Sequence, residues 1–485
     1  MFHHKTIPAA LAVLALCITV FAATYHLAES PAIWFDEGMY TQTALNLARY
    51  GTQGIQVAPH TLDSAGSVTG GFPFIGPISI SYSLFGPGVV QGRAIMVFFL
   101  VGFVILAYFS TRLLFGPTSA AITALLLSSF PMLYGDGKSV LGEVPGFFFL
   151  MGSVIFLFLL EKSRYTSRTA YAGLGVMVGL CVVTKPIFIL LLPAFGLAWL
   201  LRFRQIPLSW RGAAIGAAAF LLPIGIWIHL QFGTSDSVAG AFAFYANPYN
   251  ATDLLGLVLQ NLRRFFREIT PLYTAVLMFI WGLSLWVRRK KDSGISTTEL
   301  VLFLFSLIVI AAYMRLPGWY RYLLPAVMLA LIFLPNNVQT LFALVQERIS
   351  FLRNKQWIPY VLLTLMMAGQ WYQLANSSYV ASYYRAHRTE EITELFRQIS
   401  PERSVFVYNA PEVVVLLPSA NYYQYIKPHA TDDEESLGGE QLPLLKSGIP
   451  DYVVIGSEDY KTHLDLFNSY TIVQTKNRYT LLGRP

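Results

Sequence analysis

Residues 93–111 read RAIMVFFLVGFVILAYFST, and this stretch decides the fold because no charged residue follows its first one. A helix of this length nearly spans the roughly 30 Å hydrocarbon core of a bilayer. Comparable runs recur along the chain, which predicts a polytopic α-helical membrane protein with about eleven transmembrane helices. We expect them at about 7–25, 93–111, 118–134, 144–160, 170–184, 187–201, 212–230, 271–287, 299–314, 320–335 and 358–375.

The composition of the whole chain agrees with this prediction. Of its 485 residues, 55% are hydrophobic and only 13% are charged, whereas a soluble domain carries about 25% charged residues. The net charge of +7 comes from short basic clusters between apolar runs. That pattern is typical of membrane anchoring and argues against a nucleic-acid partner. Cys17 and Cys181 both lie inside apolar runs, so neither is placed to form a disulfide outside the membrane.

The basic clusters also predict the orientation of the chain. With a cytoplasmic N-terminus, all five clusters fall on the cytoplasmic side, as the positive-inside rule requires. One extra or missing helix would break this agreement. The clusters are His3, His4 and Lys5; Lys162, Arg164 and Arg168; Arg202, Arg204 and Arg211; Arg288, Arg289, Lys290 and Lys291; and Arg348, Arg353 and Lys355. We therefore expect a multi-pass plasma (inner) membrane protein.

This orientation divides the chain into two predicted domains. Residues 1–375 form the transmembrane domain, whose outer loops lie at 26–92, 135–143, 231–270 and 315–319. Residues 376–485 form a small soluble α/β domain on the periplasmic or otherwise extracytoplasmic side. Its expected elements are Val- and Ile-rich strands at 404–409 and 451–456, a helix at 457–469, and a hairpin of 470–475 and 478–483. Amphipathic segments at 251–269 and 336–357 are expected at the outer and inner membrane interfaces.

The first outer loop opens with Trp34-Phe35-Asp36-Glu37, two aromatic residues followed by two carboxylates. Adjacent like charges are costly unless a cation or a proton-transfer role compensates for them. The simpler interpretation is the start of a helix, where Asp36 caps the chain and Glu37 favours the helix dipole. The sequence alone leaves both interpretations open.

Other polar residues gather at the outer ends of the predicted helices. Gly135-Asp136-Gly137-Lys138 precedes Glu143, and Lys185 lies between two apolar runs. The loop 315–322 contains Arg315, Arg321 and three aromatic residues. A tight turn, a snorkelling lysine and interface aromatics explain each feature structurally. Two arginines at a membrane surface are also suited to gripping a phosphate.

These residues share one face of the membrane. A lipid-linked phosphate bound there needs cations for its phosphate and a carboxylate to activate the attacking acceptor. We therefore expect Lys185 and Arg321 to contact a carrier phosphate, with Arg315 and Lys138 as lesser candidates. If these do not, the cluster of Arg263, Arg264 and Arg267 is the alternative.

At this point the sequence resembles the GT-C membrane glycosyltransferases, in the branch of protein O-mannosyltransferases and lipid A aminoarabinose transferases. The resemblance covers about residues 1–335 and rests on motifs that occur in family order. These are Phe35-Asp36-Glu37-Gly38-Met39-Tyr40, the Gly-Pro-rich stretch 70–77, Leu84-Phe85-Gly86-Pro87-Gly88 leading to Arg93, Gly142-Glu143-Val144-Pro145, Thr184-Lys185-Pro186 and Arg321-Tyr322-Leu323-Leu324-Pro325.

The resemblance implies transfer of a sugar from a polyprenyl-phosphate carrier to a protein, lipid or glycan acceptor on the outer face. It implies that Asp36 is the catalytic base or positions the acceptor, and that Asp136 or Glu143 assists. Glu37 is a further catalytic candidate, and Tyr40 and Arg93 join the expected substrate-binding residues. No cofactor is required, although some members bind a divalent ion, for which Asp36 and Asp136 are the candidate ligands. The chain lacks the basic residue that aminoarabinose transferases carry after the Asp-Glu pair, since residues 38–41 are uncharged.

Two other classes of protein compete with this interpretation. A lipid or polysaccharide transporter, or a flippase, would place ionisable residues near the midplane and show repeat symmetry. The predicted helix interiors are nearly free of charge, and no repeat is evident. A structural subunit whose tail recruits partners would leave the outer acidic and basic loops unexplained.

Overall fold

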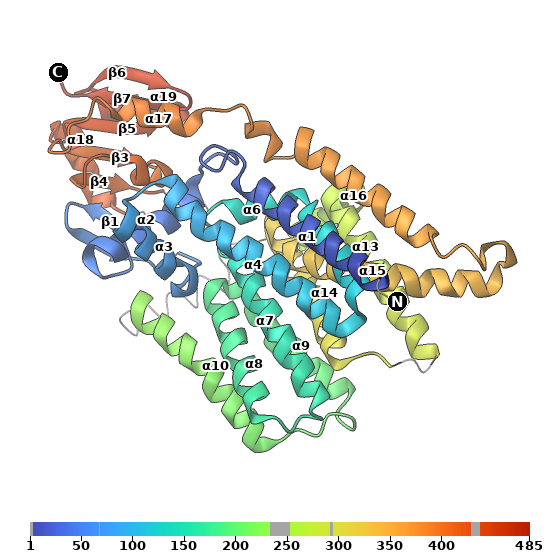
Figure 1. Cartoon of the computed structure of the whole chain (residues 1–485). Coiled ribbons are helices and arrows are strands. Elements are labelled where there is room, and N and C mark those ends of the chain that lie inside the picture. The colour runs from blue at the N-terminus through green and yellow to red at the C-terminus, as the bar shows by residue number, and fades with distance from the viewer. Residues whose placement is uncertain (1–2, 67, 233–252, 292–293, 428–436) are drawn as a thin grey trace.

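The computed structural model describes residues 3–66, 68–232, 253–291, 294–427 and 437–485. Helices dominate the first part of the chain, and a mixed sheet forms near its C-terminal end (Figure 1). The helices are α1 (His3–Thr24), α2 (Phe35–Tyr50), α3 (Phe72–Phe85), α4 (Val89–Phe115), α5 (Pro117–Ser128), α6 (Pro131–Lys138), α7 (Glu143–Lys162), α8 (Arg168–Thr184), η1 (Pro186–Leu190), α9 (Leu191–Leu201), α10 (Trp210–Gln231), α12 (Leu254–Arg267), α13 (Ile269–Lys290), α14 (Thr297–Tyr313), η2 (Tyr320–Leu323), α15 (Leu324–Arg348) and α16 (Ile358–Asn376).

Local sequence signals explain where many of these helices begin and end. Three helices begin after a serine cap, at Ser167, Ser209 and Ser296. Each serine side chain accepts a hydrogen bond from the backbone N–H three residues later, which satisfies one of the free N–H groups of the first turn. Between α4 and α5 the chain turns at Gly116, whose φ of 88° favours glycine. Pro117 then starts α5 at a position where its missing N–H costs nothing.

Fewer helices meet the length and hydropathy expected of a membrane span than the sequence predicted. Within the described ranges, six helices are long and apolar enough to cross a membrane, and a seventh span results if α5 and α6, bent by 64°, count as one. The other predicted runs also form helices, but α8, α14 and the η1–α9 segment are shorter. The expected count of about eleven is therefore not confirmed. Of the predicted outer loop 231–270, residues 233–252 lie outside the described part of the chain.

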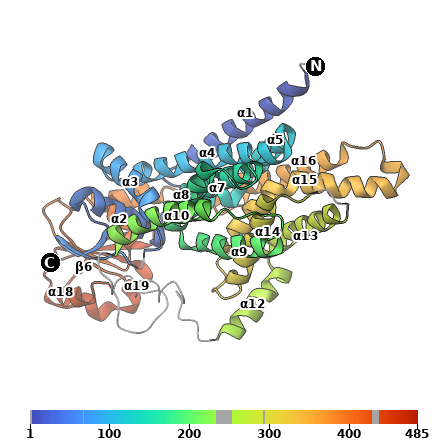
Figure 2. The same ribbon diagram turned by 90° about the horizontal axis from the view of Figure 1, so that it is seen from below.

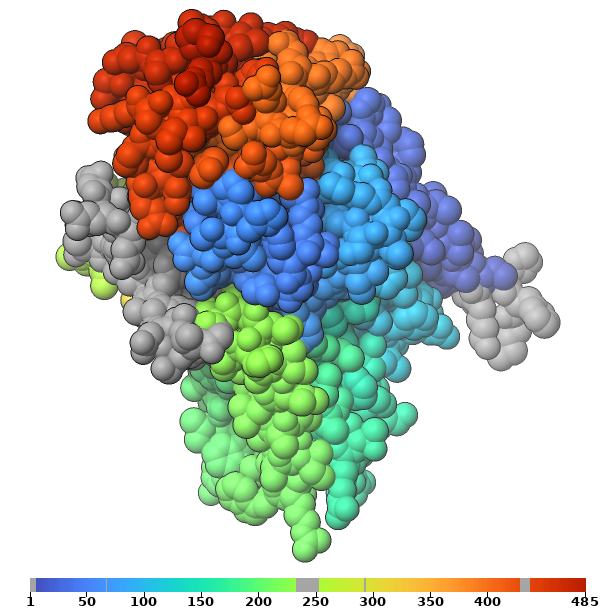
Figure 3. Space-filling view, turned by 90° about the vertical axis from the view of Figure 1, so that its left-hand side faces the viewer, coloured from blue at the N-terminus to red at the C-terminus, as the bar shows by residue number. Residues whose placement is uncertain are grey.

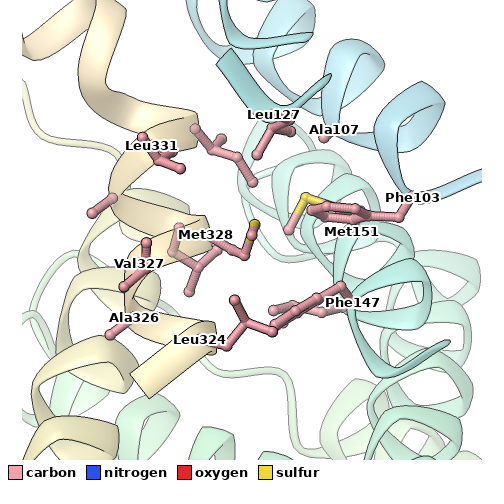
Figure 4. Close-up of a cluster of buried hydrophobic side chains, with 14 of the residues drawn as sticks. Phe103, Ala107, Leu127, Phe147, Met151, Leu324, Ala326, Val327, Met328 and Leu331 are labelled. Carbon is pink, nitrogen blue, oxygen red and sulfur yellow. The ribbon is translucent and has the colours of Figure 1, made fainter. Parts of the chain in front are cut away.

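The bundle is held by a large apolar core between α4, α5, α7 and α15 (Figure 4). Phe103 of α4, Met151 of α7 and Met328 of α15 are almost fully buried there. Helix α8 packs along both α7 and α10. Figure 2 shows α12 at the edge of the bundle, beyond α13 and α14.

The Gly-Pro-rich stretch 70–77 includes the start of α3, and Pro73 occupies the first turn, where proline is tolerated. Two predicted segments differ from the structure. The segment 336–357 is no separate interfacial helix, since α15 continues through Pro335 to Arg348. The second outer loop is partly helical, because α6 extends to Lys138.

The C-terminal domain is built on a five-stranded sheet with strand order β4-β3-β5-β7-β6. Strand β3 pairs in parallel with β4 and β5, while β7 pairs antiparallel with β5 and β6. The predicted strands and hairpin are confirmed, but β4 was missed and the helix predicted at 457–469 is only one short helix and a 3-10 turn. The elements are α17 (Arg388–Phe396), β3 (Val405–Tyr408), η5 (Pro411–Leu416), β4 (Tyr422–Tyr425), α18 (Leu442–Ser447), β5 (Tyr452–Gly456), α19 (Ser457–Thr462), η7 (Leu464–Phe467), β6 (Thr471–Lys476) and β7 (Tyr479–Gly483).

The C-terminal domain rests on the first outer loop. That loop forms α2, α3 and the hairpin of β1 (Gly54–Ala58) and β2 (Thr61–Ser64). One continuous apolar cluster joins Ala44 and Ile55 of the loop to Val407, Val413 and Tyr422 of the domain. In the space-filling view the domain sits directly on this loop (Figure 3). The contact places the Asp-Glu motif between the two domains.

Candidate active site

The first turn of α2 and the start of η2 meet through an ion pair. The Nη1 of Arg321 lies 2.5 Å from Oδ2 of Asp36. The Arg321 guanidinium also lies over the rings of Trp34 and Tyr322, at 5.2 Å from each centroid. Asp36 and Arg321 side chains keep 23% and 13% of their surface exposed. The structure therefore brings two sequence-predicted residues together in a partly accessible position.

A second ion pair lies deeper in the protein. Lys185, just after α8, has its Nζ 3.2 Å from a carboxylate oxygen of Glu143, the first residue of α7. Lys185 Nζ also donates hydrogen bonds to the Tyr40 hydroxyl at 3.0 Å and to the Thr69 hydroxyl at 3.2 Å. The Tyr40 and Thr69 hydroxyls are themselves 2.6 Å apart. Lys185, Glu143 and Tyr40 are buried, so these charges are largely shielded from water.

Glu37 is held in a different way from Asp36. Its carboxylate accepts two hydrogen bonds from Arg93 of α4, both at 2.7 Å, and one from the backbone N–H of Val140 at 3.1 Å. Arg93 also donates to the carbonyls of Leu27 and Pro31. Glu37 and Arg93 are fully buried. These contacts tie the first outer loop to α4 and to the second outer loop, which is a positioning arrangement rather than an open binding surface.

Two further candidates lie on α6. Asp136 on α6 is half-buried and interacts electrostatically with Glu143, Arg321 and Lys185. Lys138, two residues later, is buried and donates to the backbone carbonyl of Tyr25 at 2.5 Å.

Arg315 is exposed. In the alternative arginine cluster on α12, Arg263 and Arg267 are exposed, whereas Arg264 donates to the carbonyl of Gly318 at 2.7 Å. Asn261 of the same helix donates to the carbonyls of Tyr313, Met314 and Leu316. Helix α12 thus holds the loop that leads into Arg321.

The site combines three carboxylates with two cations. Asp36, Asp136 and Glu143 all surround Arg321 or Lys185. A phosphate monoester or diester could replace carboxylates as the partner of both cations, because charged hydrogen bonds to phosphate are strong. A carboxylate released in this way could accept a proton. Within the described ranges, no three His, Cys, Asp or Glu side chains are arranged to hold a metal ion, so the tentative metal ligands Asp36 and Asp136 stay a prediction.

Thr69 is the one residue of this constellation that sequence analysis missed. It lies in an irregular stretch between β2 and α3, without a charged neighbour that would mark it. Its hydroxyl reaches both Tyr40 and Lys185 only because the first outer loop folds back over α2. A single threonine in a long loop carries no sequence signal for such a role.

Comparisons with known proteins agree with this fold. Residues 73–228 match the model of the dolichyl-phosphate-mannose-protein mannosyltransferase family. This region contains Arg93, Asp136, Lys138, Glu143 and Lys185, but neither Asp36 nor Arg321. No curated protein matches the chain by sequence.

Solved structures match nearly the whole chain. ArnT from Cupriavidus metallidurans is similar in its apo state and when bound to undecaprenyl phosphate, in each case with a TM-score of 0.59 and 15% identity over 99% of this chain and 98% of that one. The oligosaccharyltransferase AglB from Archaeoglobus fulgidus, in complex with an inhibitory peptide and a dolichol-phosphate, has a TM-score of 0.56 and 14% identity over 96% of this chain and 71% of that one. At these identities the likeness concerns the fold, including the C-terminal domain.

Proposed function

We propose that this chain is a GT-C glycosyltransferase that transfers a sugar from a polyprenyl-phosphate carrier to an acceptor on the extracytoplasmic face of the membrane. The family-model match over residues 73–228 and the similar folds support this proposal. The observation that carries the proposal is the pairing of Arg321 with Asp36 beside the buried Lys185–Glu143 pair. Two cations for a phosphate thus stand next to carboxylates that could activate an acceptor.

The similar structures support the class of donor. ArnT is bound to undecaprenyl phosphate and AglB to a dolichol-phosphate, and both ligands are polyprenyl phosphates. The same chemistry suits this chain, because Lys185 and Arg321 lie at the ends of apolar helices, where the phosphate of a lipid carrier would be found. The lipid tail would remain among the apolar helices.

The proposed step is a substitution at the anomeric carbon of the donor sugar. The bond from that carbon to the phosphate oxygen breaks, and the electron pair leaves with the polyprenyl phosphate. A bond to the acceptor oxygen forms, and the acceptor proton passes to Asp36. Lys185 and Arg321 stabilise the negative charge of the leaving phosphate by preorganised hydrogen bonds.

Arg321 has two roles in this scheme. Without substrate it neutralises Asp36, and with a donor phosphate its guanidinium becomes a partner of the phosphate. The move would leave Asp36 as a free acceptor for the proton. Glu143 then holds Lys185 in place, and the half-buried Asp136 is the second carboxylate that faces the reacting groups.

The experiment that tests this function starts from the lipid carrier. In a deletion strain, mass spectrometry of carrier lipids should show one polyprenyl-phosphate sugar accumulating, and wild-type protein should reverse the accumulation. Purified protein should then release polyprenyl phosphate from that lipid when acceptor membranes are added. An Arg321→Ala variant should not reverse the accumulation, whereas Arg315→Ala, changed at an exposed position of the same loop, should. Normal carrier lipids in the deletion strain would contradict the proposal.

A further inference from the structure

The C-terminal domain contacts the first outer loop on both sides of Asp36. On the N-terminal side, the Glu29 carboxylate accepts hydrogen bonds from the backbone N–H groups of Thr389 and Glu390, at 2.9 and 3.1 Å. Ser30 donates to the carbonyl of Val380 at 2.7 Å. Glu29 thereby caps the start of α17, and the chain is fixed just before it reaches the Asp-Glu motif.

Closest to Asp36, the two domains touch through their backbones at Gly38. A Cβ atom added to Gly38 would lie 2.2 Å from the backbone nitrogen of Glu412 and 2.4 Å from the carbonyl carbon of Pro411. Real Cβ atoms do not approach other atoms so closely, and neither neighbour is a flexible side-chain end. Only glycine at position 38 therefore lets η5 lie directly on the first turn of α2.

Beyond Gly38, a buried network of glutamines continues the contact. Gln42 of α2 donates to the Tyr422 hydroxyl at 3.2 Å and to the Gln424 side chain at 3.1 Å. Gln424 donates to the backbone carbonyl of Gln56, and Gln56 donates to the carbonyls of Ala420 and Tyr422. Gln42, Gln56 and Gln424 are fully buried. Such groups need their partners, because a buried amide without a hydrogen bond is costly.

These contacts support one side of the first turn of α2, and the pair of Glu37 with Arg93 holds the other side. The N-cap residue Trp34 makes no side-chain hydrogen bond to the first turn of α2. Asp36 itself pairs with Arg321, and that pair must loosen if a phosphate takes Arg321. The position of Asp36 in such a complex would then depend on what holds α2, which is the Glu37–Arg93 pair on one side and η5 and strand β4 on the other.

We propose that the C-terminal domain is a positioning element of the active site, and that Gly38 and Gln42 are the positioning residues through which it holds Asp36 in place. The proposal rests on the proposed function for its catalytic consequence. Neither residue reaches the reacting groups; both act through the placement of α2. A displacement of about 1 Å in a catalytic group can cost roughly 100-fold in rate.

The test compares Gly38→Ala with Gly76→Ala, a matched change in helix α3 where an added Cβ meets nothing within 4 Å. The rate is expressed per site that binds undecaprenyl phosphate, so that loss of folded protein does not count. We expect Gly38→Ala to lower kcat about 10- to 100-fold while the Kd for undecaprenyl phosphate changes less than about twofold, because Lys185 and Arg321 lie outside α2 and Lys185 keeps its ion pair with Glu143. Gly76→Ala should match the wild type. A second variant, Gln424→Met, keeps the side-chain volume, removes the hydrogen bonds to Gln42 and Gln56, and should lower kcat in the same way.

Hydrogen–deuterium exchange gives a readout that does not depend on activity. Backbone amides of α2 should exchange faster in Gly38→Ala and Gln424→Met than in the wild type, while those of β3 and β5 in the domain core remain protected. Unchanged exchange in α2, or a kcat per binding site equal to that of the wild type, would overturn the proposal. If wild-type protein transfers no sugar, the proposed function fails, and the exchange of α2 still decides whether the domain holds it.

Discussion

The Asp36 carboxylate lies 2.5 Å from the Arg321 guanidinium, although 285 positions separate the two residues in the chain. The contact joins the first turn of α2, in the first outer loop, to η2, which lies just before α15. Both residues stay partly exposed, in contrast to the fully buried Glu37–Arg93 pair one position away. Adjacent carboxylates thus have two different environments, one accessible and one structural.

The buried pair should be a stability determinant. We expect Glu37→Gln to lower the apparent melting temperature in detergent, because removing one partner of a buried ion pair typically costs about 3–5 kcal/mol. Arg93→Met should be comparably destabilising. The double variant Glu37→Met with Arg93→Met should cost less than the sum of the single changes, since no uncompensated charge remains. Strictly additive losses in a thermal-unfolding comparison would argue against this account.

The two cations of the site should determine donor affinity. A hydrogen bond to a charged group contributes about 1.5–3 kcal/mol, so Lys185→Gln and Arg321→Gln should each weaken undecaprenyl-phosphate binding by about 10- to 100-fold. Titration of purified protein with the lipid measures the effect. Arg315→Gln is the control, because Arg315 is exposed. Full affinity in both site variants would shift attention to Arg263 and Arg267 on α12.

Orientation is a separate prediction that rests on the sequence. If the basic clusters face the cytoplasm, the C-terminal domain and the site lie outside. An alkaline phosphatase fused after Pro485 should therefore be active, and a fluorescent reporter that folds only in the cytoplasm should be silent at the same position. The reverse pattern would place Asp36 and Arg321 on the cytoplasmic face and exclude an extracytoplasmic acceptor.

The stability of the docked C-terminal domain should depend on pH through Glu412. Burial raises the pKa of this carboxyl above its usual value, and the hydrogen bond from Tyr479 and the nearby Arg478 only partly oppose that effect. The folded protein then binds more protons than the unfolded chain at pH values between the unfolded and folded pKa. Stability is therefore highest below the unfolded value of about 4.3 and falls as pH rises through the raised folded pKa.

Glu412→Gln should remove this dependence. We expect thermal-unfolding midpoints of the wild type to fall as pH rises from the unfolded pKa through the raised folded pKa of Glu412, with a flatter profile for the variant and little difference between the proteins at the acid end. Glu394→Gln, at a partly exposed position of the same domain where the hydrogen bond from Lys476 lowers the pKa of the carboxyl, serves as the control. Parallel profiles for wild type and Glu412→Gln would show that other groups govern the pH dependence.

How much of this site the sequence could reveal depends on the range of each contact. The membrane helices follow from runs of apolar residues, and Asp36, Lys185 and Arg321 are marked by charge at the ends of such runs. The pairing of Glu37 with Arg93, the approach of Thr69 to Lys185 and the packing of Gly38 on Glu412 join segments far apart in the chain. No local pattern encodes them, because each depends on how the outer loop folds back over the bundle and under the C-terminal domain. The predicted span count is not confirmed by length and hydropathy alone, because helices such as α8 are shorter than a full span.

The chemistry itself predicts the effect of Asp36→Asn. A hydroxyl acceptor must lose its proton as the bond to the anomeric carbon forms, and a positioned base typically contributes about 10²–10⁴ in rate. Asparagine keeps the shape of Asp36 but cannot take the proton, so transfer from a labelled polyprenyl-phosphate sugar should fall by about that factor. The variant should still insert in membranes and bind undecaprenyl phosphate, because Lys185 and Arg321 remain and Arg321 loses a competing partner. Glu37→Gln should lose less activity per folded molecule, since its carboxylate is already occupied by Arg93 and Val140. Asp63→Asn, an exposed carboxylate of the same outer loop, is the matched control. Near-normal turnover by Asp36→Asn would remove Asp36 as the base, and would favour an acceptor that is already ionised, such as a phosphate.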